Sequence, residues 1–487
     1  MTPLKVWAGR AFVGGLAPIV VFGSRFAANV VLSRLLAPEE FGTAVAISVV
    51  LGLGGLATDV ALDRFVMIDG SARGLSTAHL LAVSNGIFLA TILVLFAPFA
   101  AGLFGIPKFA GSFALAAIVS VIGAFGHLGV KQIQRNYDYG PDTIAQVAAN
   151  VASIIGLFIA AKLLRNHYAI IVGLGVQSAV YVVLSHVLAP TSYRFNCDKE
   201  MLFRALSFGL PLTLNGIGLA MLSQLDRVLV GHWFGVKELG LYAVIFSVSV
   251  VPTSLIINVF SRPSFSFLIS DEETSRRPQR YRLLLTFYSL ITSLYACWMV
   301  LTLDLLIPLI FGPSFTISPT AHVLFVLIAC LRLQRSAAPT CLLLASGRTK
   351  QLAALNLSAG VGLIVAFVCV TISPTLEAML VGVAVGEFLS FIAFFTTLGS
   401  AVTRGWRVLG DLASAISAPA IMAAALAFDA VPTWRERAVL LVIAMVTVAV
   451  QLSLELYRNT EFRKVVSGLP IVRGLPSYFA RGEVCPD

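Results

Sequence analysis

Long apolar stretches recur along this whole sequence and restrict the folds that are open to it. A helix needs about 20 mostly apolar residues to cross a bilayer, and such stretches follow one another through the 487 residues. Hydrophobic residues make up 58% of the chain and charged residues 12%, about half the charged share of a soluble domain. Lipid tolerates only helices and closed barrels, and long continuous apolar runs are typical of helices. We therefore predict an all-α integral membrane protein.

The same length criterion predicts fourteen transmembrane helices. Their expected ranges are 12–36, 41–66, 78–103, 109–130, 143–163, 168–189, 205–231, 239–269, 283–311, 319–346, 352–372, 376–399, 411–431 and 437–457. The first range follows a basic start but is too long for a cleavable signal sequence, so we expect it to be the first span. A short turn containing Gly235 and Gly240 is expected to join the seventh and eighth spans.

The distribution of basic residues predicts the orientation. With the amino terminus in the cytoplasm, 23 of the 34 Lys and Arg fall at cytoplasmic ends of spans, 6 at outer ends and 5 within spans. Because basic residues accumulate on the cytoplasmic side, both termini are expected there. The membrane topology and contact with anionic lipids explain the net charge of +10, so no nucleic-acid partner is expected.

Motifs for a cofactor or a metal are missing from the sequence. Four of the six cysteines fall within apolar stretches and two in predicted cytoplasmic loops, so a disulfide framework is not expected. The chain has no C-x-x-C pair, no His-rich pair and no nucleotide-binding loop. We therefore expect no cofactor, no metal and no catalytic residues.

An internal repeat divides the chain. Glu40-Phe41-Gly42 opens the second predicted span and Glu238-Leu239-Gly240 opens the eighth, so the glycines are 198 residues apart. Arg64 and Arg262 share this separation. Six spans per half give both halves the same orientation. We predict two six-helix halves, 1–200 and 201–400, followed by 401–487 with helices 13 and 14 and a basic cytoplasmic tail.

Short motifs mark the seventh and eighth spans: S-F-G-x-P, then L-D-R, then L-G-x-Y. The residues are Ser207, Phe208, Gly209 and Pro211, then Leu225, Asp226 and Arg227, then Leu239, Gly240 and Tyr242. In these motifs and in its repeat, the chain resembles the polysaccharide exporters, or Wzx-type lipid-linked oligosaccharide flippases. They belong to the multidrug/oligosaccharidyl-lipid/polysaccharide exporter (MOP) superfamily.

This resemblance implies a function and a location. The implied function is a flippase that moves undecaprenyl-pyrophosphate-linked oligosaccharide across the bacterial inner membrane for exopolysaccharide or O-antigen assembly. Transport would proceed by alternating access through a cationic cavity. The implied partners are the lipid-linked oligosaccharide and, for assembly, a polysaccharide polymerase and export machinery.

Arginines within the predicted spans are the first candidates for this cavity. A charge within the bilayer is costly and usually faces a bundle interior, and a guanidinium binds phosphate oxygens in pairs. In the related lipid II flippases, arginines of spans 1, 2 and 8 serve this purpose, and the resemblance assigns it to Arg25, Arg64 and Arg262. As an alternative, Arg64 and Arg262 would anchor the cytoplasmic ends of their spans. The alternative for Arg34 is that its side chain extends to the outer surface of the membrane.

Further charged residues are candidates for a gate or for coupling to an ion gradient. These are Asp59, Asp63, Asp226, Arg227 and Glu387. Asp63 has the alternative role of neutralising Arg64, and the Asp226–Arg227 neighbours that of a structural pair. Arg332 and Arg335 share a helix face; they are expected to form a second cationic patch or to pair with Glu387.

Two alternative functions stay open. Asp59 and Asp226 are compatible with a cation-coupled exporter of drugs or metabolites, although arginines within the spans argue against cationic cargo. A lipid II flippase of the same fold is the other alternative, but the L-G-x-Y and S-F-G-x-P motifs favour the polysaccharide branch.

Overall fold

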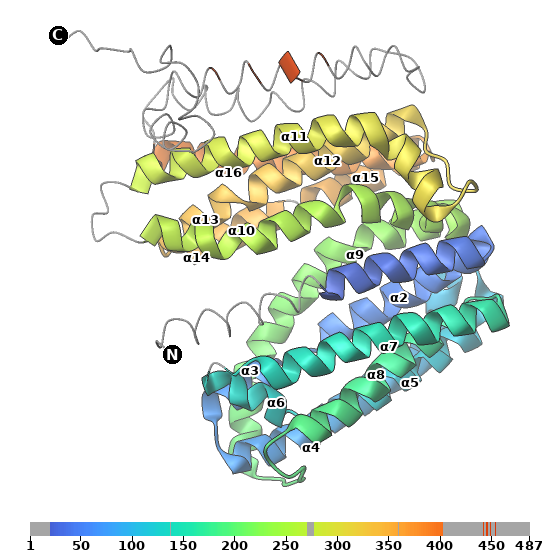
Figure 1. Ribbon diagram of the computed structural model, residues 1–487, viewed down its shortest axis with the longest axis vertical. Coiled ribbons are helices and arrows are strands. Elements are labelled where there is room, and N and C mark those ends of the chain that lie inside the picture. Colours follow the sequence, from blue (N-terminus) through green and yellow to red (C-terminus); the bar gives the residue numbers. More distant parts are fainter. Residues whose placement is uncertain are drawn as a thin grey trace, which may run out of the picture. The chain divides into compact units, whose positions relative to one another are not determined.

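The computed structural model describes residues 20–136, 138–269, 277–358 and 360–402, with five single positions between 442 and 453. These residues are helical apart from short connections (Figure 1). After a helical segment at 20–35, the first part contains α2 (Pro38–Thr58), α3 (Leu62–Asp69), α4 (Ala72–Leu103), α5 (Ala110–Ala124), α6 (Gly129–Gln132), α7 (Gly140–Leu164) and α8 (Tyr168–Leu188). There follow α9 (Lys199–Ser249), α10 (Val251–Ile269), α11 (Arg277–Phe311), α12 (Pro319–Ser336), α13 (Ala338–Ala345), α14 (Thr349–Ser358), α15 (Gly360–Ile372) and α16 (Leu376–Val402).

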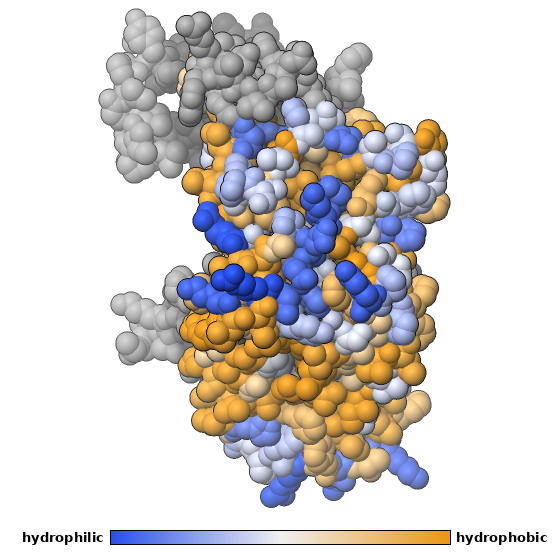
Figure 2. Space-filling view, turned by 90° about the vertical axis from the view of Figure 1, so that its right-hand side faces the viewer, coloured by the Kyte–Doolittle hydropathy of each residue, from blue (hydrophilic) through white to orange (hydrophobic). Residues whose placement is uncertain are grey.

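The helices have the length and surface of membrane spans. Within the described part of the chain, ten helical stretches are long and apolar enough to cross a bilayer. Large apolar side chains lie on the surface, among them Leu95 at 70% and Phe99 at 68% exposure, and Figure 2 shows broad areas of such hydrophobic residues. The all-α membrane fold is therefore confirmed. The predicted span 411–431, the start of the first span and all but five positions of the span 437–457 lie outside the described residues, so the number fourteen stays a prediction.

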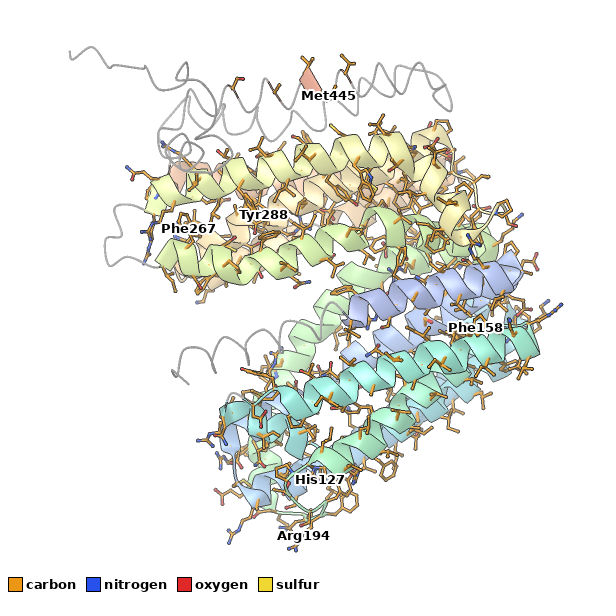
Figure 3. All side chains as sticks on the ribbon, in the orientation of Figure 1. His127, Phe158, Arg194, Phe267, Tyr288 and Met445 are labelled. Atoms are coloured by element: carbon orange, nitrogen blue, oxygen red, sulfur yellow. The ribbon has the colours of Figure 1, made fainter. Side chains whose placement is uncertain are left out.

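The described helices form two compact units. Unit 1 contains residues 20–255, 303–325 and 360–386, and unit 2 contains 256–302, 326–358 and 387–402. In unit 2 the core joins α11, α13 and α16 through buried residues such as Tyr288, Leu342 and Phe394, and Figure 3 shows Tyr288 and Phe267 in this unit. The predicted division into two six-helix halves is based on the internal repeat in the sequence and not on these units, and it stays a prediction.

The second predicted span is interrupted. We expected one helix over 41–66, but α2 ends at Thr58 and α3 begins at Leu62. Between them Asp59 accepts a hydrogen bond from the Ala61 amide at 2.8 Å, and Ala61 has a left-handed backbone with φ of 50°. A side chain that binds a backbone amide two residues ahead competes with helical pairing, which explains the interruption.

The S-F-G-x-P motif packs against this interruption. A Cβ atom on Gly209 would lie 2.3 Å from the carbonyl oxygen of Val60, so only glycine allows the two backbones to approach. Thr213 donates to the Asp59 carbonyl at 2.8 Å, and the rings of Phe65 and Phe208 are 6.4 Å apart. The motif therefore has a packing role in unit 1.

The expected turn between spans 7 and 8 is shorter than the sequence suggested. Within α9 only Gly235 leaves the helical conformation, with φ of 83°, a backbone that favours glycine. Gly240 lies in the helix that follows. There a Cβ atom would approach the Cα of Gly42 to 3.3 Å, and a Cβ on Gly42 would lie 1.7 Å from the Val236 carbonyl oxygen. The two repeat glycines therefore contact each other in unit 1.

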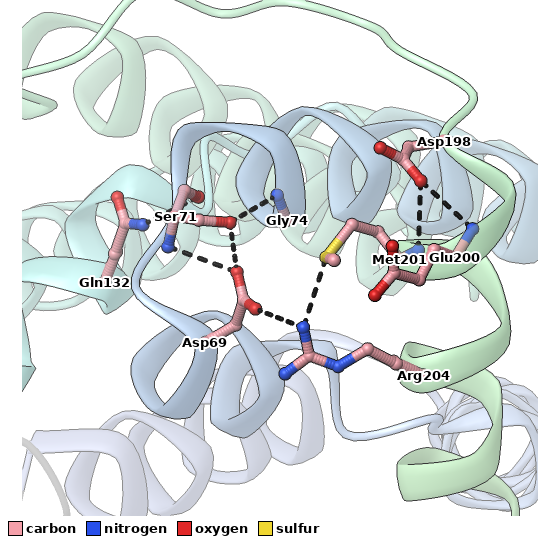
Figure 4. Close-up of polar contacts among 8 residues, drawn as sticks. All are labelled: Asp69, Ser71, Gly74, Gln132, Asp198, Glu200, Met201 and Arg204. Carbon is pink, nitrogen blue, oxygen red and sulfur yellow. Dashed lines mark hydrogen bonds and ion pairs between the residues drawn. The ribbon is translucent and has the colours of Figure 1, made fainter.

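The turn between α3 and α4 is fixed by polar contacts, drawn in Figure 4. Ser71 caps α4 by accepting from the Gly74 amide at 2.9 Å. Asp69 accepts from the Ser71 amide and hydroxyl and forms an ion pair with Arg204 at 3.4 Å. Asp198 caps α9 by accepting from the amides of Glu200 and Met201. These contacts join the start of α9 to the α3–α4 turn.

Candidate functional site

Two arginines from different helices of unit 1 lie close together. Arg25 comes from the segment at 20–35 and Arg227 from α9. The positive charge of Arg227 acts on that of Arg25. The helices are joined beside them, because Asn29 donates to the Ser247 hydroxyl at 2.9 Å. We call this group of residues the Arg25–Arg227 cluster. Arg25 is exposed and Arg227 half-buried, and two cations on adjoining helices of a membrane protein favour the binding of an anion.

The carboxylate of Asp226 does not neutralise this cluster through an ion pair. Asp226 is buried and accepts a hydrogen bond from the Tyr242 hydroxyl at 2.6 Å. Its other oxygen accepts from the backbone amide of Arg227 at 2.8 Å. We predicted a structural role for the Asp226–Arg227 pair as an alternative, and the two side chains form no ion pair with each other. Instead, Asp226 joins the two parts of α9 through Tyr242.

Arg227 is held in place without a carboxylate. Its guanidinium lies over the Phe246 ring, with 4.7 Å between the guanidinium carbon and the ring centroid, and it donates to the Gln224 side chain at 2.8 Å. The Nε atom is buried and has no hydrogen-bond partner among the described residues. A buried donor without an acceptor is costly. Neither Gln224 nor Phe246, which hold Arg227, was among the site residues predicted from the sequence.

A partly buried polar chain leads away from the cluster inside unit 1. Ser24, beside Arg25, donates to the Asn150 side chain at 2.6 Å, and Gln177 donates to the same oxygen at 3.1 Å. Farther along α7, the carboxylate of Asp142 accepts from Lys131 at 2.7 Å and from Tyr181 at 3.0 Å. Sequence reasoning did not find this chain, because single polar residues in apolar stretches give no periodic signal.

The remaining predicted arginines differ in their contacts. Arg34 donates to the carbonyls of Leu309 and Ile310, which lie at the end of α11, where a cation is favoured. Arg64 is exposed on α3, and no described residue accepts from its guanidinium or pairs with it. Arg262 belongs to α10 in unit 2, and its side chain lies outside the described residues. The charge interaction of Arg25 is with Arg227, which was a candidate for the gate and not for the cavity.

The acidic candidates of the second span are surface residues. Asp59 and Asp63 are both exposed, and each accepts from a nearby backbone amide, that of Ala61 and that of Arg64 respectively. The sequence placed them within a continuous span. Asp59 lies at the α2–α3 interruption. Asp63 lies in the first turn of α3, where a negative charge stabilises the helix N-terminus.

Unit 2 contains a buried charge triad. Glu387 of α16 accepts from Arg332 at 2.8 and 3.0 Å and pairs with Arg335 at 3.0 Å. Glu387 and Arg335 are buried, and Arg335 also lies over the Phe394 ring. Of the two arrangements considered for Arg332 and Arg335, the structure has the pairing with Glu387. A carboxylate between two guanidiniums strongly favours its ionised form.

Comparison with known proteins identifies the family. A family model described as "Polysaccharide biosynthesis protein" matches residues 31–318, more than half of the chain. A similar curated protein is the succinoglycan biosynthesis transport protein ExoT of Rhizobium meliloti (strain 1021), with 22% identity over 282 residues. The match covers 53% of each protein, so the chain spans about half the length of this relative.

Solved structures show the fold. A multidrug resistance MATE family transporter of the MOP superfamily, in an inward-facing conformation, has a TM-score of 0.58 and 14% identity, with 80% of this chain and 95% of that one covered. A MOP superfamily transporter from Pyrococcus furiosus gives 0.50 and 13%, with 82% and 95% covered. These relatives are transporters and not enzymes. The chain has the fold of MOP transporters, and it is a multi-pass membrane protein that belongs to the polysaccharide biosynthesis protein family.

Proposed function

We propose that this protein is a flippase that moves an undecaprenyl-pyrophosphate-linked oligosaccharide from the inner to the outer leaflet of the bacterial plasma membrane. The sugar would serve exopolysaccharide or O-antigen assembly. The observation that carries the proposal is the Arg25–Arg227 cluster, two guanidiniums in a membrane unit whose adjacent carboxylate, Asp226, is engaged by Tyr242. The family and the name of the Rhizobium relative, a transport protein of succinoglycan biosynthesis, support it.

The mechanism follows from the chemistry of the cargo. A pyrophosphate loses its hydration water when it enters the bundle, and fixed guanidiniums replace that water with paired hydrogen bonds. The lipid tail stays in the bilayer while the halves alternate between inward- and outward-facing states. Arg64 and Arg262 belong to this proposal as further ligands. Arg64 is exposed on α3 and would meet the pyrophosphate at the cytoplasmic entrance.

A cation-coupled exporter is the second candidate, and its support is the fold it shares with a multidrug transporter. Such an exporter needs a carboxylate that exchanges its proton or a metal cation. Asp226 is occupied by Tyr242 and a backbone amide, and Glu387 by two arginines. These contacts favour the flippase. A lipid II flippase would bind the pyrophosphate of its cargo through the same arginines. It would differ in the sugar that the cargo carries.

The experiment is complementation of a bacterial strain that lacks its own polysaccharide flippase. Wild type, Arg25→Ala and Arg25→Lys are compared at equal membrane levels, with Arg165→Lys as a control at the exposed end of α7. We expect wild type and the control to restore polymer and both Arg25 variants to fail, because lysine lacks the planar fork. Normal polymer from Arg25→Ala would refute the cationic site. If wild type itself fails with several sugars but exports cationic drugs, the second candidate is correct.

The location and partners are part of the proposal. Both termini would lie in the cytoplasm, and the outer leaflet product would pass to a polysaccharide polymerase and export machinery. The support is the distribution of basic residues, 23 at cytoplasmic and 6 at outer ends.

A further inference from the structure

Three exposed arginines surround the turn between α3 and α4. Arg73 lies in the first turn of α4, Arg135 comes from the segment between α6 and α7, and Arg204 comes from the start of α9. A Cβ atom on Gly70 would lie 1.9 Å from a terminal nitrogen of Arg135, so this guanidinium lies directly on the turn. Arg204 reaches the preceding residue, Asp69, at 3.4 Å. We call the three arginines the arginine surface.

One buried carboxylate balances these cations only in part. The side chain of Asp69 is 6% exposed, accepts from the amide and hydroxyl of Ser71 and pairs with Arg204 (Figure 4). Arg73 and Arg135 form no ion pair with any residue in the described ranges. The arginine surface therefore carries an excess of positive charge.

The arginine surface lies where two helices of membrane-spanning length meet. The stretches Pro38–Asp69 and Ala72–Leu103 are both long and apolar enough to cross a bilayer, and the turn joins them. Large apolar side chains next to the arginines are exposed, Ile68 at 65% and Phe203 at 74%. This combination fits the boundary between headgroups and acyl chains, because apolar side chains contact the chains there while guanidiniums reach the phosphates.

We propose that the arginine surface binds the headgroup of an anionic phospholipid of the adjoining leaflet, such as phosphatidylglycerol. A guanidinium binds two phosphate oxygens through parallel hydrogen bonds, and basic groups at a bilayer surface attract anionic lipids. The acyl chains of this lipid would pack against Ile68 and Phe203. The three arginines are exposed, so a lipid of the bilayer reaches them directly. The inference holds whether or not the protein moves a lipid-linked sugar.

The bound headgroup would also hold three parts of unit 1 together. The contacts that join them at this turn are few: the ion pair of Asp69 with Arg204 and a hydrogen bond of 3.3 Å from Gln132 to the Ser71 carbonyl. A ligand that binds the folded chain and not the unfolded chain raises the stability of the fold. We therefore expect phosphatidylglycerol to raise the unfolding midpoint of the protein in detergent, and phosphatidylcholine to raise it less.

The test is titration of the full chain in detergent with phosphatidylglycerol and phosphatidylcholine of the same acyl chains, read by native mass spectrometry. Wild type is compared with Arg73→Gln combined with Arg135→Gln. The control is Lys108→Gln combined with Lys162→Gln, which removes two exposed cations after α4 and at the end of α7. We expect the arginine pair to weaken the first phosphatidylglycerol binding step about tenfold or more and the lysine control to leave it near wild type.

Two results of this titration would overturn the inference: equal affinity of wild type for the two lipids, or unchanged phosphatidylglycerol affinity in the arginine pair. The unfolding midpoint of each variant is measured without lipid. Arg73→Lys combined with Arg135→Lys keeps both charges, so it should retain the preference for phosphatidylglycerol. Loss of that preference in the lysine pair at a wild-type midpoint would also count against a charge-selective lipid site.

A photochemical probe locates the lipid. Benzoylphenylalanine is placed at Phe203, beside Arg204, and irradiation is expected to attach phosphatidylglycerol but little phosphatidylcholine. The attachment should fall when Arg73→Gln and Arg135→Gln are added. Undecaprenyl pyrophosphate at the same concentration should leave it unchanged. If the pyrophosphate lipid displaces the phospholipid, the arginine surface is an entrance for cargo and the inference is wrong.

Discussion

Histidines at one end of unit 1 are held as neutral acceptors. His127 accepts from the Gly129 amide at 2.9 Å, and His79 accepts from the Leu128 amide at 3.2 Å while its other nitrogen contacts the Arg194 carbonyl. His127 and Arg194 are labelled at this end in Figure 3. The rings of His186 and Tyr193 lie 5.2 and 5.4 Å from that of His127. A protonated imidazole has no acceptor, so protonation breaks these contacts.

We expect acid to destabilise the protein partly through His127. Burial lowers the pKa of this histidine, and the nearby His186 lowers it further. The unfolded chain then binds more protons than the folded chain as the pH falls below about 6.5. The stability that neutral His127 contributes is therefore present above that pH and is lost below it.

The thermal unfolding midpoint is measured at pH 7.5 and at pH 5.5. The difference between these two midpoints should be smaller for His127→Gln than for wild type. His232→Gln, at an exposed position, should keep the wild-type difference; an unchanged difference in His127→Gln would refute the prediction.

The charge triad of unit 2 gives a second prediction at this scale. Glu387→Gln removes the carboxylate that pairs with Arg332 and Arg335, and we expect it to destabilise the fold by about 3 kcal/mol or more. Glu377→Gln is the control on the same helix, because the Glu377 carboxylate accepts a single side-chain hydrogen bond among the described residues, an exposed one from Ser318. The free energy of unfolding of both variants is measured by denaturation of the purified protein in detergent. Equal stability of the two variants would mean that the triad contributes nothing.

Close helix contacts in this protein depend on single glycines. Gly42 faces the Val236 carbonyl, whereas Gly55, on the same helix, has open space around it. On α15 and α16, Gly362 and Gly386 approach each other in the same way, since a Cβ on Gly386 would lie 2.0 Å from the Cα of Gly362. Small residues of this kind let membrane helices pack backbone to backbone.

Gly42→Ala and Gly55→Ala form a matched pair of variants. The first inserts a methyl group where a carbonyl oxygen lies 1.7 Å away, so α2 and α9 must separate, at a cost of about 1–3 kcal/mol. The second fills open space and gains helix propensity. We expect a lower unfolding midpoint only for Gly42→Ala. Equal unfolding midpoints for the two variants would show that the contact between α2 and α9 tolerates an added methyl group.

The sequence predicted individual helices better than their ends and contacts. Apolar length identified the stretches that became α4, α7, α8 and α11, because length and hydrophobicity are properties of one segment. It missed the interruption after Thr58, which depends on Asp59 and on the approach of Gly209 from α9. Arg25 was found as a charge within a span, but Phe246 was not, since a phenylalanine in an apolar stretch is ordinary until its arginine is placed.

At the scale of the whole molecule, orientation is the property that the basic residues predict most directly. A fluorescent protein folds only in the cytoplasm and alkaline phosphatase is active only outside it. We expect a fusion after Asp487 to fluoresce and the phosphatase fusion at the same point to be inactive. Active phosphatase there would place the carboxyl terminus outside and would require an odd number of spans between the termini or an inverted chain.

The contact between Gly42 and Gly240 has a consequence for the origin of the fold. The two glycines occupy equivalent places in the predicted repeat, 198 residues apart, and they meet. In a repeat of the predicted kind, equivalent residues would touch at the two-fold axis that relates the copies, as in the isologous interface of a symmetric dimer. A single-repeat ancestor of such a chain would have used one glycine to contact its own partner subunit, and duplication and fusion would have preserved that subunit interface inside one polypeptide.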